Sequence, residues 1–236
     1  MKNLTKITFT LMILSGMVFN LSGQTIKERI DAAKTVKVYI SIKDIVHVPN
    51  TNAAPGSQAK GTGCVNFTQT TPFPANYADE VKQIVDMLNK GFNTTAFVAG
   101  DISAVPLFTT GIQKGNQDWL KLGEPLVFSV STSGTYTVTN MGLMGDVKLS
   151  NSLSIVSGIG VYGIIDGKLK ALAVKNLGSV TSPSKESKTC GDYDYFVKNF
   201  PLADFFEQFK TSFEKKTADF IQNEMDNYDK AMKKKK

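Results

Sequence analysis

Four residue types that usually carry chemistry are scarce in this chain of 236 residues. It holds one tryptophan, one histidine and two cysteines, and Arg29 is its only arginine. Because arginine is the side chain best suited to bidentate contacts with phosphates and bases, its scarcity disfavours nucleic-acid binding. A single histidine, His47, cannot build a multi-histidine zinc site. The composition therefore predicts no nucleic-acid partner, no metal site and no cofactor.

The body of the chain also lacks an excess of charge. The formal net charge is +6, but Lys2, Lys6 and the four lysines 233–236 account for it. The terminal lysines lie where a helix dipole favours cations, so they need no partner to explain them. Seven acidic residues against four lysines between 201 and 232 oppose docking on an anionic membrane surface. A membrane-surface partner is therefore not expected.

Long apolar runs are absent after the first residues. The chain opens with Lys2 and Lys6, continues with an apolar run over 7–19, and reaches the small residues Ser22 and Gly23. This order is typical of a cleaved signal peptide, and the apolar part is shorter than a membrane span; the alternative is a retained anchor. We therefore expect a signal peptide over 1–23 and a single secreted or periplasmic domain over 24–236, with a basic tail at 233–236.

The two cysteines suit an exported protein. An even number of cysteines outside the cytoplasm most simply forms a disulfide, here Cys64 to Cys190. Polar segments over 49–63 and 181–188, which resemble loops, lead into the two positions. The alternative, a catalytic Cys64 thiol, lacks a partner base that the sequence places nearby.

Hydrophobic periodicity predicts an α+β fold. Apolar residues repeat with helical spacing over 24–34, 77–88 and 201–232, and Asn76 is a candidate N-cap for the second helix. We expect an antiparallel sheet packed on a long C-terminal amphipathic helix, with one shorter internal helix. The last turns of the long helix should extend beyond the body. Strands are expected over 36–46, 94–99, 125–132, 135–140, 147–156, 160–165 and 169–174, with tight turns at Ser133-Gly134 and Asp166-Gly167.

Three motifs resemble catalytic or ligand sites but lack the context that those sites need. Residues 158–163 match G-x-G-x-x-G, yet the residues that follow have strand rather than helix character. Asp192 and Asp194 form a D-x-D pair, which is better explained as a cap for a short helix than as a calcium site. His47 ends a strand without an accompanying nucleophile motif. The sequence therefore identifies no catalytic residue and favours a non-enzymatic protein.

Aromatic side chains are the remaining candidates for a binding site. Five phenylalanines share one face of the C-terminal helix, which could contact the core, line a ligand cavity or face a membrane. Trp119 lies in a loop-like stretch and is either a contact residue or a plug at the core edge. The candidate ligand-binding residues are Phe205, Phe206, Phe209, Phe213, Phe220 and Trp119.

Three functional hypotheses follow from these patterns. The first is a secreted non-enzymatic protein that binds a small apolar or amphipathic ligand in a cavity between sheet and helix. The second is a secreted or envelope-associated factor that binds a protein partner through the C-terminal helix. The third is a carboxylate-dependent hydrolase, because the sequence distinguishes no pair among its many acids.

Overall fold

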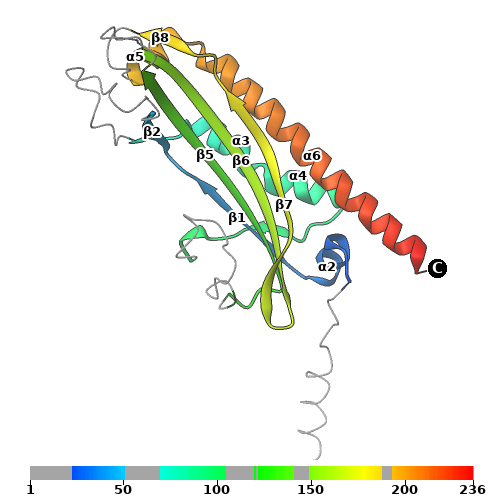
Figure 1. The fold of residues 1–236 in the computed structure, drawn as a ribbon. Coiled ribbons are helices and arrows are strands. Elements are labelled where there is room, and N and C mark those ends of the chain that lie inside the picture. Colours follow the sequence, from blue (N-terminus) through cyan, green and yellow to red (C-terminus); the bar gives the residue numbers. More distant parts are fainter. Residues whose placement is uncertain are drawn as a thin grey trace, which may run out of the picture.

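The computed structural model describes residues 23–50, 70–104, 120, 122–140, 149–187 and 193–235. Figure 1 shows a long curved sheet with a long helix running diagonally across it. The α+β class, the long C-terminal helix and the shorter internal helical segment are confirmed. None of the described helices combines the length and the hydropathy of a membrane span. The predicted signal peptide, except for Gly23, lies outside the described residues.

All eight described strands belong to one sheet, in which β5 is central. On one side β5 pairs with β6, which in turn pairs with β7 and β8. On its other side β5 pairs with β1 and then β2, and these two strands carry β4 and β3 at the edge. The strands are β1 (Val36–Ile42), β2 (Ile45–Asn50), β3 (Thr70–Thr71), β4 (Phe97–Ala99), β5 (Leu126–Asn140), β6 (Leu149–Ile165), β7 (Lys168–Thr181) and β8 (Lys185–Ser187).

The sheet is mixed, whereas an antiparallel sheet was expected. β5 runs parallel to β1 and β2, and β4 runs parallel to β1. Parallel neighbours require a crossover connection, usually helical. The helices between β3 and β4 supply it: α3 (Ala75–Lys82) and α4 (Ile84–Gly91). The second half of the sheet, β5 to β8, is antiparallel as expected.

One of the two predicted hairpin turns is confirmed and the other is wrong. Asp166 and Gly167 form the turn between β6 and β7, and both have positive φ (53° and 69°), as a tight primed hairpin turn requires. Ser133 and Gly134, in contrast, lie inside the continuous strand β5. A Cβ on Gly134 would lie 2.7 Å from Cγ1 of the buried Ile45. Close packing against Ile45 therefore explains this glycine, which needs no turn.

The internal helix is divided in two. α3 ends at Lys82 and α4 begins at Ile84, with Gln83 between them at φ −62° and ψ −8°. The N-cap of α3 is Pro74, without a side-chain cap, so the assignment of Asn76 as the cap was wrong. The remaining helices are α2 (Ile26–Ala32), the 3-10 turn η2 (Ile102–Ala104), α5 (Tyr193–Asn199) and α6 (Leu202–Lys234).

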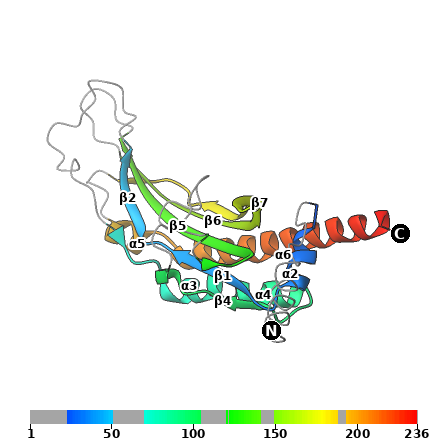
Figure 2. The same cartoon turned by 90° about the horizontal axis from the view of Figure 1, so that it is seen from below.

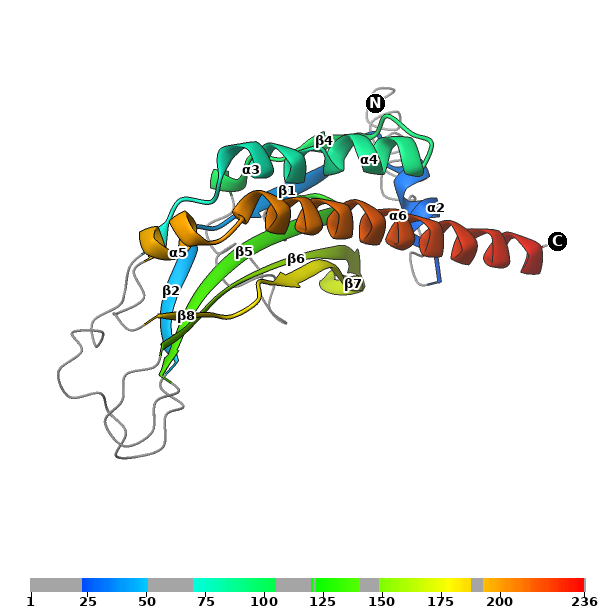
Figure 3. The same ribbon diagram turned by 90° about the horizontal axis from the view of Figure 1, so that it is seen from above.

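In the described part of the chain, all helices longer than one turn cover the same face of the sheet. Figure 3 shows α3, α4 and α6 side by side on this face, with α2 and α5 near its two ends. α3 and α6 are joined by Glu80 and Lys210, whose Oε1 and Nζ lie 3.0 Å apart. The hydrophobic core fills the space between this helical layer and β1, β5 and β6.

The last turns of α6 extend beyond the sheet, as predicted (Figure 2). They lie beside α2, where the Lys27 ammonium sits 5.9 Å from the centre of the Tyr228 ring. Lys235 donates a hydrogen bond to Glu28. Glu28 also closes a capping box with Thr25 at the start of α2. The first described helix and the end of the last one are therefore tied together.

Candidate functional site: the open face of the sheet

The face of the sheet opposite the helices is the site on which the functional argument rests, and we call it the open face. Along β5, alternate residues such as Val130 and Tyr136 are buried under the helices. Their neighbours Ser131 and Ser133 point to the other side and are exposed. The two-residue period of a strand thus separates a core face from an open face.

The open face is built largely from hydroxyl-bearing side chains. The register places Val46, Thr135, Ser154 and Thr181 in one row across β2, β5, β6 and β7. The Ser154 and Thr181 hydroxyls are hydrogen-bonded to each other at 3.0 Å. The hydroxyl residues that face outward on β5 and β6 are Ser129, Ser131, Ser133, Thr135, Thr137, Thr139, Ser150, Ser152 and Ser154.

Valines alternate with these hydroxyls and remain accessible. Val46, Val48 and Val156 are 40–41% exposed, and Val174 on β7 is 65% exposed. All four lie on the open face, because their paired neighbours Thr135, Thr137, Ser133 and Gly160 point outward. An isolated exposed valine needs no explanation, but several on one face give that face apolar character.

The strands that build the centre of the open face carry no charge. β2, β5 and β6 have 6, 15 and 17 residues and contain no Asp, Glu, Lys or Arg, although 20% of the chain is charged. Two charged residues, Lys43 and Asp44, link β1 to β2 beside the middle of β5, where the Lys43 amide donates to the Thr132 carbonyl. Lys37 on β1 and Glu186 on β8 lie nearer the ends of the face. Depletion of charge is one mark of the centre of a protein–protein interface, although serine is also depleted there and aromatic residues are enriched.

One end of this face is closed by a small second core. Tyr39 and Val127 are buried there against Ile102, Leu122 and Leu169. The Tyr39 hydroxyl donates to Glu124 Oε1 over 3.0 Å, and the Lys37 ammonium lies 2.6 Å from the same oxygen. Burial, followed by the contact with the Glu124 carboxylate, raises the pKa of Tyr39. The accessible part of the face therefore starts beyond this cluster, near Ser129.

The phenylalanine stripe that was predicted to bind a ligand lies in the core. All five side chains are only 2–3% exposed. The Phe206 ring stacks on Tyr77 at 4.4 Å between centroids, and a Cβ on Gly178 of β7 would lie 3.3 Å from the Phe213 backbone nitrogen. These contacts show that the five phenylalanines pack in the core; that they bind a ligand stays a prediction.

Trp119, Cys64 and Cys190 lie outside the described residues, so their predicted roles also stay predictions.

The glycine-rich motif 158–163 lies within β6, which confirms its strand character. The Tyr162 ring folds over Gly160, where a Cβ would lie 2.4 Å from the ring. Gly163 faces the other side, and a Cβ there would lie 3.0 Å from the Leu172 side chain and 3.2 Å from Arg29 Nη1. Close side-chain packing therefore accounts for these two glycines.

The single histidine belongs to a buried polar and aromatic cluster under α5. His47 is 3% exposed, and its Nε2 lies 2.9 Å from the Thr71 hydroxyl. Its ring contacts Tyr136 and Tyr193 at centroid distances of 5.4 and 4.9 Å. The Tyr136 hydroxyl donates to Asn151 Oδ1 over 3.1 Å. These contacts hold β3 and α5 on the end of the sheet.

The acidic pair 192–194 is only partly described. Asp194 lies in the first turn of α5, which agrees with the predicted role at a short helix, and Asp192 lies outside the described residues. Within the described ranges, no three His, Cys, Asp or Glu side chains are placed to hold a metal ion together.

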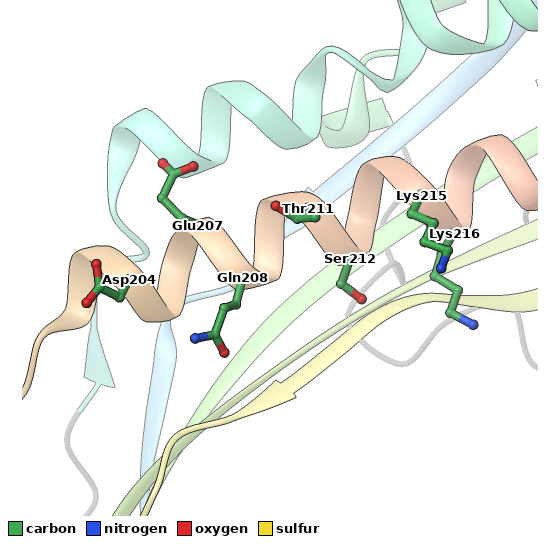
Figure 4. Close-up of a pocket in the computed structure, with 7 residues that line it drawn as sticks. All are labelled: Asp204, Glu207, Gln208, Thr211, Ser212, Lys215 and Lys216. Atoms are coloured by element: carbon green, nitrogen blue, oxygen red, sulfur yellow. The ribbon is translucent and has the colours of Figure 1, made fainter.

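A shallow polar hollow follows the outer side of α6. Figure 4 shows that Gln208, Ser212 and Lys216 point from the helix toward the edge formed by β7 and β8. Asp204 and Glu207 lie at one end of the hollow, and the lysines lie at the other. Asp204 lies in the first turn of α6, where the helix dipole favours an acid. We therefore interpret this hollow as the solvated side of α6.

Comparison with known proteins gives distant structural likenesses. No family model and no curated protein matches the chain. A hypothetical protein from Chlamydia trachomatis is 11% identical, with a TM-score of 0.37 over 80% of this chain and 98% of that one. A neuraminyllactose-binding hemagglutinin homologue from Helicobacter pylori is 11% identical, with a TM-score of 0.34 over 85% and 90%. A DUF330 protein from Xanthomonas campestris is 8% identical, with a TM-score of 0.33 over 80% and 82%. Because these TM-scores are low, the functional inference rests on this chain alone.

The open face was not predicted, although the sequence contains a signal for it: a serine or threonine at every second position from Ser129 to Thr139, in a long segment without charge. The turn expected at Ser133-Gly134 divided this run into two short strands and concealed its length.

Proposed function

We propose that this chain is an exported, non-enzymatic binding protein whose open face is covered by another protein surface in its working state. The observation that carries the proposal is the absence of charged residues from β2, β5 and β6, which form most of that face. A solvated sheet face normally carries polar side chains in alternation with its core residues. Here the alternate positions are polar but uncharged serines and threonines, interrupted by valine, so the lack of charge and not a lack of polarity supports the proposal.

The protein-partner hypothesis is kept, but the binding surface proposed here is the open face of the sheet instead of the end of α6. The end of α6 has partners within the chain, because Tyr228 contacts Lys27 and Lys235 binds Glu28. Deleting this end would therefore remove intramolecular contacts together with any docking surface. The open face has few such contacts of its own among the described residues, so substitutions on it are cleaner tests.

The hypothesis of a small apolar ligand under the helix receives less support. The side chains that would line such a cavity pack against one another and against the sheet. It stays a prediction that a solvent extract of the purified protein can test, since a stoichiometric small molecule in the extract would favour it. The hydrolase hypothesis has no specific observation in its favour.

The size of the native complex tests the proposal. We expect the wild-type chain, extracted gently from cells that produce it, to elute in size-exclusion chromatography well above the size of the monomer. Thr137→Lys places a charge in the centre of the open face, between Val48 and Ser152 in the row across three strands. This variant should elute at monomer size, because a buried charge without a partner strongly opposes association.

The matched control is Thr211→Lys, which makes the same substitution at an exposed position on α6. It should leave the elution of the complex unchanged, and thermal unfolding should show that both variants are folded. Elution of the wild type as a monomer, or of Thr137→Lys with the wild-type complex, would contradict the proposal.

A further inference from the structure

We infer that the partner which covers the open face is a second copy of this chain, so that two sheets pack face to face in a symmetric dimer. This inference rests on the proposed function, and it adds the identity of the partner. In such an isologous contact the same surface patch meets itself across a twofold axis. Face-to-face packing of sheets about 10 Å apart is a common architecture within single domains.

The dimensions of the face suit a dimer. From Ser129, where the accessible part begins, to Asn140, β5 has 12 residues, and at ~3.3 Å per residue this stretch is ~40 Å long. β5 and β6 are flanked by β1 or β2 on one side and by β7 or β8 on the other, so the face is about four strands wide. At ~4.8 Å between strands, four strands are ~19 Å wide, which gives a face of roughly 750 Å². A standard specific interface buries about 800 Å² on each partner.

The electrostatic character of the face also favours a second copy. A surface that meets itself brings like charges together unless charges of both signs are interleaved across the axis. The rows Val46–Thr135–Ser154–Thr181 and Val48–Thr137–Ser152 contain no charge at all, so nothing in them repels an identical row. Their hydroxyls can donate and accept, and each can therefore pair with its own kind.

The sheet edge, in contrast, is poorly suited to self-association. Among the described strands, β7 forms the edge beside α6, and it carries exposed lysines at positions 168, 170 and 175. Its ladder with β6 is interrupted by irregularities at Ser157/Gly158 and Val161/Tyr162. Lysines and bulges are the usual devices that prevent pairing at an edge. We therefore expect the second copy to bind the open face and not the edge of the sheet.

Sedimentation velocity on the purified full chain tests the inference. We expect the wild type to sediment as a dimer that dissociates across a dilution series, and Thr211→Lys to behave identically. Thr137→Lys should sediment as a monomer at every concentration. Ser131→Lys, which lies in another row of the face, provides a second variant in case the first one unfolds.

The outcomes separate the two proposals. A purified wild type that is monomeric throughout overturns the inference of a second copy. The proposed function still stands in that case if cell extracts contain a complex that Thr137→Lys disrupts. A dimer that survives both Thr137→Lys and Ser131→Lys, with both variants folded, places the contact elsewhere and overturns the inference as well.

Discussion

A single buried hydroxyl gives the sharpest prediction at the scale of residues. Thr217 lies on the core side of α6 and is fully buried. Its hydroxyl finds no hydrogen-bond partner among the described residues. A buried polar group without a partner costs about 1–3 kcal/mol. Thr217→Val keeps the shape and removes the hydroxyl, so we expect the free energy of unfolding to rise by ~1 kcal/mol in urea titrations.

The exposed Thr211 of the same helix is the matched control for this substitution. Thr211→Val should change the free energy of unfolding by less than ~0.5 kcal/mol. A loss of stability in Thr217→Val would show that its hydroxyl has a partner, and would contradict this account of the helix–sheet packing.

Glu28 gives a pH-dependent prediction. Its pKa is lowered from 4.5 to about 2, first by the hydrogen bond from Lys235 and then by the one from the Thr25 backbone amide. A carboxyl whose pKa is lower in the folded state stabilises the fold above its unfolded pKa, and loses this effect as the pH falls. The stability difference between wild type and Glu28→Gln should therefore be constant from neutral pH to about 5. This stability difference should narrow as the pH falls from 4.5 to about 2.

The size of this difference should be modest, because Lys235 is largely exposed and surface ion pairs contribute about 1 kcal/mol or less. Urea unfolding of both proteins at several pH values measures it. Lys235→Gln is the companion variant and should reduce the same pH dependence. An unchanged pH dependence in Lys235→Gln would mean that the contact between the two helix ends is not formed in solution.

At the scale of elements, the continuity of β5 is the feature that most needs a test. Gly134 has no room for a side chain because Ile45 packs over it. Overpacking of a filled core costs typically 1–3 kcal/mol, so Gly134→Ala should lower the free energy of unfolding by about that amount. Ser133→Ala, one residue away on the open face, should have little effect. Equal effects of the two substitutions would contradict the placement of Gly134 against Ile45.

Elements with strong periodicity were predictable from the sequence. α6 was expected over 201–232 and occupies Leu202–Lys234, because its phenylalanines repeat with helical spacing. The turn at Asp166-Gly167 was predictable because few sequences tolerate two consecutive positive φ values. Ser133-Gly134 has the same local signal, but the packing of the distant Ile45 decides its conformation. A contact between residues so far apart in sequence leaves no local pattern.

The parallel half of the sheet was not predictable for a similar reason. The apolar alternation of β1 and β5 fixes which side of each strand is buried, but not which strand lies beside it. Pairing depends on the helical crossover through α3 and α4, whose packing involves the whole core. The open face could not be predicted from the sequence either. Its hydroxyl residues were visible there, but their assembly into one face depends on the register of four strands.

At the scale of the whole molecule, the central claim is that the open face is covered when the protein works. Site-specific photo-crosslinking inside the producing cells tests this claim most directly. A benzoylphenylalanine in place of Ser152 reports on the open face, and one in place of Gln208 on the outer side of α6. We predict a defined adduct only from position 152. Its mass should be twice that of the chain, its crosslinked peptides should come from β5 or β6 of the second copy, and Thr137→Lys should abolish it. The absence of any adduct from position 152, or the same adduct from both positions, would contradict the account.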